Sequence, residues 1–122
     1  MTRQIIVFIV LILCVPVTGF SGEADVVGVE VKNVGNDSFH FDVTVQHDDT
    51  GWDHYADKWE VIAPDGEVVG IRTLHHPHVG EQPFTRSLSG VRIEADVSSV
   101  TVRAHDSVHA YGGKRVTVEL PH

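Results

Sequence analysis

Histidine is the residue type whose number and placement in this sequence point most directly to chemistry. The 122 residues include nine histidines. They are His40, His47, His54, His75, His76, His78, His105, His109 and His122. Neutral imidazole is a common ligand for Zn, Cu, Ni and Fe, and three or four ligands complete a site. The histidines therefore indicate a divalent transition-metal site, provided that the fold brings several of them together.

His76-Pro77-His78 is the first candidate pair of metal ligands. Side chains of an extended chain alternate sides, so residues two apart can aim both imidazoles the same way. Pro77 also biases His76 toward an extended backbone. His105 and His109, four residues apart, form the second pair, and we expect these four histidines to be the ligands. The second-tier candidates are His47, His54, His75 and Glu81.

Several carboxylates near these histidines are candidate oxygen ligands, or acceptors that orient an imidazole. They are Asp48, Asp49, Asp53, Glu81 and Asp106. Soft sulfur ligands are scarce, because Met1 and Cys14 are the only methionine and cysteine of the chain. This composition disfavours Cu(I) relative to Zn(II), Cu(II) or Ni(II) as the bound metal.

The elements that must position these side chains are predicted to be strands. Apolar and polar residues alternate with period two and break at turn residues, and no stretch keeps a helical period. Pro64-Asp65-Gly66 is one such turn, because proline presets φ and glycine accepts a positive φ. The expected strands cover residues 26–34, 38–46, 58–63, 67–74, 84–93, 100–104 and 115–120.

Seven short strands in about a hundred residues predict an all-β fold, a Greek-key β-sandwich. The pattern resembles the immunoglobulin and fibronectin type III architecture, and Trp59 on the third strand fits the core tryptophan of such folds. The immunoglobulin cysteine pair and a tyrosine on the sixth strand are absent. A likeness at the level of the fold implies no activity.

Strand reversals predict where the loops lie. If successive strands alternate in direction, the loops after the second, fourth and sixth strands meet at one end of the molecule. Seven of the nine histidines fall in or beside these loops, and the two turns expected at the opposite end, Pro64–Gly66 and Ala95–Ser99, contain none. Loops on a rigid scaffold commonly carry binding groups. Trp52, Tyr55 and Tyr111 of the same loops either pack onto the core or contact a protein partner.

The first 19 residues predict a secretory signal peptide, with Arg3, an uncharged run from Ile5 to Val15, and small residues after it. Cleavage could fall as late as Ala24. The run is shorter than the roughly 20 apolar residues of a transmembrane helix. Lipid anchoring through Cys14 is the alternative, since Leu11-Ile12-Leu13-Cys14 resembles a bacterial lipobox. We expect residues 25–122 to form a single exported domain, periplasmic or secreted, with no transmembrane segment.

The charge balance excludes some partners. Once Arg3 is removed with the signal, 17 acidic residues remain against 8 basic ones. This excess disfavours nucleic acid and anionic membrane surfaces as partners. The sequence also lacks a phosphate-binding loop pattern and a Gly-x-Ser-x-Gly nucleophile elbow.

These features predict an exported metal-binding module that captures, buffers or delivers a divalent transition metal. One alternative is a small periplasmic metalloenzyme, in which a carboxylate acts beside an open coordination position. Another is a metal-free protein-interaction domain that responds to pH, since histidine titrates near neutral pH. The sequence by itself identifies no substrate, reaction or partner.

Overall fold

Seven antiparallel strands make up the fold of residues 22–122, the part of the chain that the computed structural model describes. The strands are β1 (Asp25–Gly35), β2 (Ser38–Gln46), β3 (Ala56–Ile62), β4 (Val68–Thr73), β5 (Phe84–Arg92), β6 (Ser99–Asp106) and β7 (Val116–Glu119). Each boundary lies within two residues of the expected one. The expected signal peptide, residues 1–19, and Cys14 lie outside the described residues.

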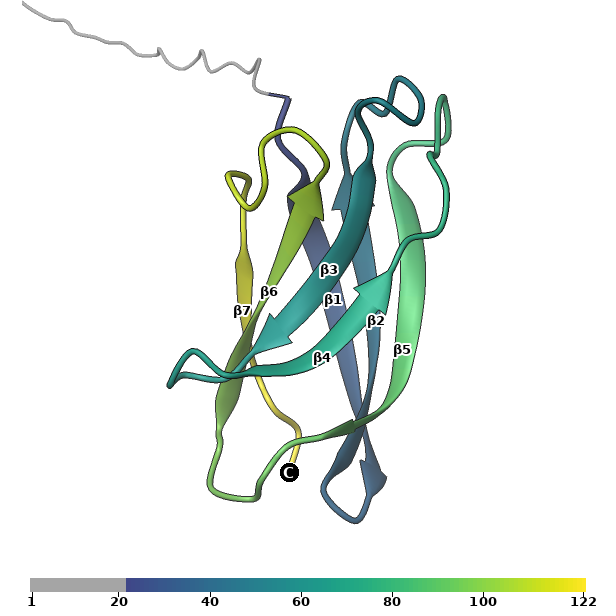
Figure 1. The fold of residues 1–122 in the computed structure, drawn as a ribbon. Coiled ribbons are helices and arrows are strands. Elements are labelled where there is room, and N and C mark those ends of the chain that lie inside the picture. Colours follow the sequence, from purple (N-terminus) through teal and green to yellow (C-terminus); the bar gives the residue numbers. More distant parts are fainter. Residues whose placement is uncertain (1–21) are drawn as a thin grey trace, which may run out of the picture.

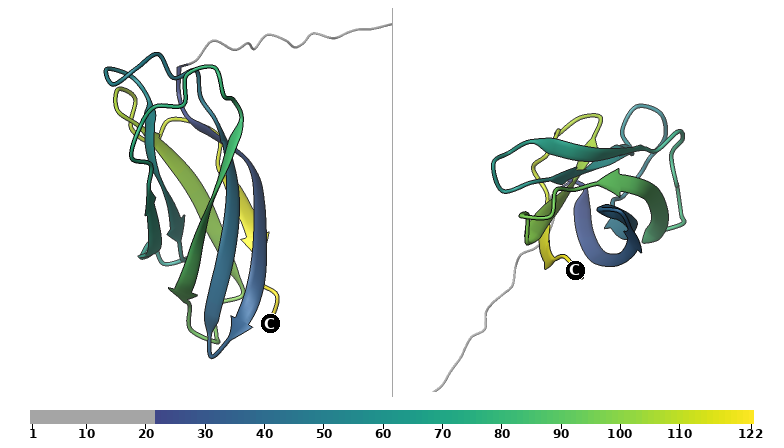
Figure 2. Two further views of the ribbon diagram at one scale, coloured as in Figure 1. Left: turned by 90° about the vertical axis from the view of Figure 1, so that its right-hand side faces the viewer. Right: turned by 90° about the horizontal axis from the view of Figure 1, so that it is seen from below.

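The strands form two sheets that pack face to face as a sandwich (Figure 1). One sheet has the order β1-β2-β5, and the other has the order β4-β3-β6-β7. All neighbouring pairs are antiparallel. Figure 2 shows the two sheets as separate layers, with loops at both ends. The all-β, two-layer prediction is therefore confirmed.

Alternating residues of both sheets build the core between the layers. From β2 come Phe39, Phe41, Val43 and Val45, all fully buried. Opposite them, Trp59 of β3 is also fully buried, as the position of this residue on the third strand predicts. The remaining buried apolar residues include Val61, Val100, Val102 and Ala104. Burial of this apolar surface is the main force that holds the two sheets together.

Glycines mark two breaks in the strands. Gly66, with φ of +92°, closes the predicted tight turn between β3 and β4, and its N–H donates to the carbonyl of Ala63 at 2.9 Å. Gly90, with φ of +71°, lies in β5 where the pairing with β2 shifts register. Both conformations favour glycine because a side chain would clash with the backbone.

Three loops lie at one end of the sandwich (Figure 1), as the strand reversals predict. They cover residues 47–55, 74–83 and 107–115. The start of β1 lies at the same end, since Asp25 pairs with Gln46 at the end of β2. Within residues 22–122, no helix is long and apolar enough to cross a membrane.

Candidate metal centre

His47 continues the buried face of β2 beyond the end of that strand. Inward positions of β2 are the odd-numbered ones from Phe39 to Val45, and His47 is the next in phase. Its side chain is 1% exposed. Because side chains along a strand alternate sides, the next inward position after Val45 places an imidazole at the end of the core.

Asp106 arrives at the same place from the other sheet by the same rule. The inward residues of β6 are Val100, Val102 and Ala104, and Asp106 is the next in phase at the end of the strand. Its side chain is fully buried. Burial of a charged carboxylate costs free energy unless hydrogen-bonding or charged partners compensate it. The partners of Asp106 therefore indicate the role of this residue.

His54 completes a group of three ligand-type side chains. Its Nε2 lies 3.2 Å from Nε2 of His47. The nearest Asp106 oxygens are 3.6 Å from Nε2 of His47 and 3.5 Å from Nε2 of His54. All three ligand atoms lie within 4.8 Å of one another, and the group could hold a metal ion. Metal bonds of 2.0–2.2 Å in a tetrahedral site separate ligand atoms by about 3.3 to 3.6 Å. The separation of the two Nε2 atoms is close to this range, and each histidine comes that near to a different oxygen of Asp106.

Backbone donors hold the Asp106 side chain in place. The N–H groups of Val108 and His109 both donate to its Oδ1. Burial alone would raise the pKa of the Asp106 carboxyl, but these two donors and the nearby His47 hold that pKa below its ordinary value. The carboxylate thus stays charged, and its Oδ2 receives no backbone hydrogen bond among the described residues and faces His47.

Asp49 orients the His47 ring from the opposite side. The Nδ1–H of His47 donates to Oδ1 of Asp49, so Nε2 is the ring nitrogen that faces the Gly22 carbonyl, His54 and Asp106. Asp49 is itself 3% exposed and accepts two more hydrogen bonds, from the N–H of Ala56 at 3.0 Å and of His78 at 2.7 Å. Histidine ligands in metal sites characteristically donate their second N–H to a carboxylate in this way.

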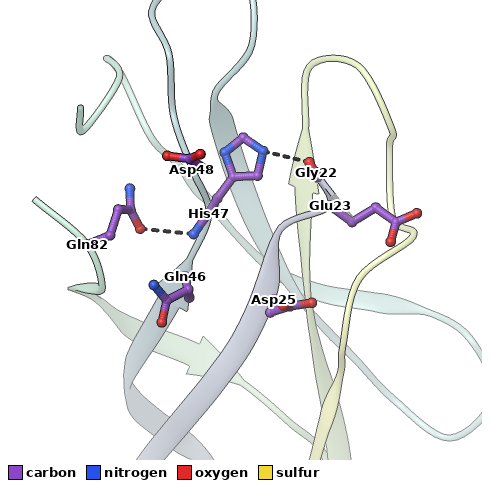
Figure 3. Close-up of a pocket in the computed structure, with 7 residues that line it drawn as sticks. All are labelled: Gly22, Glu23, Asp25, Gln46, His47, Asp48 and Gln82. Carbon is purple, nitrogen blue, oxygen red and sulfur yellow. Dashed lines mark hydrogen bonds between the residues drawn. The ribbon is translucent and has the colours of Figure 1, made fainter. Parts of the chain in front are cut away.

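A hollow of about 270 Å³ lies beside this group, with His47 in its wall (Figure 3). Its lining includes the acidic residues Glu23, Asp25 and Asp48. Figure 3 shows the His47 ring turned toward Gly22, whose carbonyl oxygen lies 2.8 Å from Nε2. The main chain that precedes β1 therefore covers one side of the histidine.

Among the described residues, neither His76 nor His78 belongs to this group of ligand atoms. The ring of His78 stacks on Phe84, with centroids 4.0 Å apart, and its Nε2 accepts a hydrogen bond from Arg86 at 2.8 Å. Its Nδ1 is buried and has no partner among the described residues. Burial and the Arg86 guanidinium lower the pKa of His78. His76 is exposed, and its ring lies 4.8 Å from that of His78.

His105 lies in β6 rather than in the following loop, because this strand extends two residues further than the pattern predicts. Residues of a strand alternate sides, so His105 is on the outer face of its sheet while Asp106 faces inward. Its Nδ1–H donates to Asp57 at 2.6 Å, and its ring packs against Tyr111.

Of the four expected ligands, only His109 lies beside the group, and its Nδ1 is 3.3 Å from Oδ2 of Asp106. The second-tier residues His47 and His54 are within the group, whereas His75 and Glu81 are exposed residues of the 74–83 loop. Among the described residues, His76, His78, His105 and His109 form no joint group of ligand atoms.

The comparisons with known proteins give one relative at the level of sequence. A "Putative lipoprotein" of Halomicrobium mukohataei is 41% identical to this chain over 97 residues. The match covers 80% of this chain but 47% of that protein, so the chain spans about half the length of the curated relative. No protein-family model matches the chain, and no solved structure matches it.

Proposed function

We propose that this protein is an exported metal-binding module, which holds one divalent transition-metal ion between His47, His54 and Asp106. The observation that carries the proposal is the convergence of these three side chains at the end of the core, within 4.8 Å of one another. His47 and Asp106 are buried. Each continues the inward face of a strand, so the geometry of the strands supports their convergence.

The donor set favours a borderline transition metal over a hard cation. Calcium and magnesium prefer oxygen ligands, whereas imidazole suits Zn, Cu(II) and Ni. The role that we propose is capture, buffering or delivery of such an ion. The lipoprotein name of the relative supports an exported location, with lipid anchoring through Cys14 as a further proposal. The strand orders β1-β2-β5 and β4-β3-β6-β7 support an immunoglobulin or fibronectin type III-like Greek key.

A metal titration of the full chain, produced without a histidine tag, tests this function. We expect one equivalent of Zn(II) or Co(II) to bind, and bound metal to raise the melting temperature, because a ligand that binds only the folded state stabilises it. Since His47 and Asp106 belong to different sheets, the ion would also link the two layers.

Substitutions locate the site. His54→Gln replaces an imidazole by an amide, and Asp106→Asn replaces a charged carboxylate by a neutral amide. Each should abolish stoichiometric binding, while the matched control His76→Gln, an exposed histidine at the same end, should bind as wild type does. Circular dichroism checks that each variant folds. Loss of binding in His76→Gln, with binding retained in His54→Gln, would move the site to the 74–83 loop. Absence of binding by the wild-type chain would reject the function.

A small metalloenzyme is the second candidate, because three protein ligands leave a coordination position open, as in catalytic zinc sites. Hydrolytic or redox turnover by the metal-loaded wild type, lost in His54→Gln, would favour the enzyme over the binding module.

A further inference from the structure

We infer that His109 is the fourth ligand of the ion and the exchangeable one, through which metal is loaded and released. This inference rests on the proposed function and adds a mechanism of exchange to it. It assigns the module a ligand set of three imidazoles and one carboxylate, suited to a four-coordinate divalent ion of the zinc type.

The main chain of His109 is tied to the metal ligand beside it. The N–H of His109 donates to Oδ1 of Asp106, and its ring nitrogen Nδ1 lies 3.3 Å from Oδ2 of the same carboxylate. The rings of His109 and His54 have centroids 4.9 Å apart. His109 therefore stands within a side-chain rotation of the position that a fourth ligand would take.

Exposure separates His109 from the other donors. The side chains of His47 and Asp106 are 1% and 0% exposed, that of His54 is 24% exposed, and that of His109 is 38% exposed. A buried donor can leave the ion only if the end of the core opens, whereas an exposed side chain changes rotamer within nanoseconds. The ligand that yields to an incoming acceptor is therefore His109.

The segment before β1 lies against the rings of His54 and His109. A Cβ added at Gly22 would lie 2.9 Å from Cε1 of His109 and 3.2 Å from Cε1 of His54. The carbonyl of Gly22 also contacts Nε2 of His47. The main chain of Gly22 therefore covers one flank of the site. The exposed edge of the His109 ring is then the route by which the metal ion exchanges.

Cobalt(II) spectroscopy of the full chain tests the inference, because visible absorption of Co(II) strengthens in four-coordinate sites. We expect His109→Ala to keep one equivalent of Co(II), with a weaker and shifted spectrum. Its release to a chelator should be faster by on the order of 10- to 100-fold, a change at least as large as those that outer-shell substitutions cause in metal affinity. His76→Ala is the matched control and should match the wild type in both readouts.

A second variant should add an absorption band that the wild type lacks. His109→Cys replaces the imidazole by a thiolate donor and should add a sulfur-to-cobalt charge-transfer band, which His76→Cys should not show. Cys14 is common to all the proteins compared.

An unchanged spectrum and release rate in His109→Ala, with no new band in His109→Cys, would overturn the inference while the proposed function stands. Complete loss of Co(II) from a folded His109→Ala would overturn the exchange role. Absence of Co(II) binding by the wild type would instead remove the proposed function itself.

Discussion

At the scale of single residues, the candidate site depends on a buried carboxylate that is not one of its three grouped ligands. Asp49 accepts N–H groups from three segments, namely the end of β2, the start of β3 and the 74–83 loop. It therefore sets which nitrogen of His47 faces His54 and Asp106, and at the same time it joins the loops at this end. Removing its charge should weaken metal binding through His47 without removing a donor atom.

We expect Asp49→Asn to lower metal affinity by about 10- to 100-fold, the usual effect of a change in the outer shell of a metal site. The control is Asp48→Asn, which removes the same charge from an exposed neighbour. Competition titration against a coloured chelator measures both. Equal affinities for the two variants would show that Asp49 acts only through the net charge of this end.

At the scale of elements, the loop between β6 and β7 is anchored on the outer face of its sheet. Tyr111 donates its hydroxyl to Oε2 of Glu60 at 2.9 Å, and the Arg103 guanidinium lies 3.9 Å from the centre of its ring. Arg103 also donates twice to Oε1 of Glu60. These contacts on the outer face of the sheet therefore hold the loop that carries His109 in place. His105 packs against the same tyrosine.

Tyr111→Phe should reduce the free energy of unfolding by about 1.5 kcal/mol, because it removes a hydrogen bond to a buried charged group. Tyr55→Phe is the matched control, since the Tyr55 side chain makes a ring contact with Trp52 rather than a hydrogen bond to a carboxylate. Chemical denaturation measures both changes. An equal effect of the two variants would show that the Glu60 contact does not stabilise the fold.

At the scale of the whole molecule, buried titratable groups make stability depend on pH. Burial and Arg86 lower the pKa of His78 from its ordinary 6.5, so the unfolded chain takes up a proton there before the folded one does. Burial would raise the pKa of Glu60, but Arg103 and Tyr111 bring it below its ordinary 4.5. For both groups, the unfolded state binds more protons than the folded state at pH values between the two pKa values of the group. The free energy of unfolding therefore falls as the pH falls.

The free energy of unfolding of the metal-free protein should therefore decline as the pH drops below about 6.5 and decline further below about 4.5. His78→Phe keeps an aromatic ring beside Phe84 and removes the titrating group, so the first part of the decline should become shallower. Denaturation at a series of pH values measures this. An unchanged slope in the variant would contradict the assignment to His78.

Much of the architecture could be predicted from residue patterns, and the candidate site only in part. Strand reversals placed the histidine loops at one end. His47 was expected only as a second-tier candidate beside a loop, although the alternation of β2 extended by one step would have pointed it inward. Asp106 was predicted only as a possible oxygen ligand, because β6 was expected to end at Ala104. An extension of the alternating pattern by two residues would have placed its side chain in the core.

Period two along each strand, set by the sequence itself, determined the strands and their buried face, and the reversals between strands determined the end at which the histidine loops lie. Which of those imidazoles meet was decided only by the tertiary structure. A loop has no period that fixes the direction of its side chains, so packing turned His78 onto Phe84 and left His76 in solvent, while the two sheets brought His47 and Asp106 together across the core.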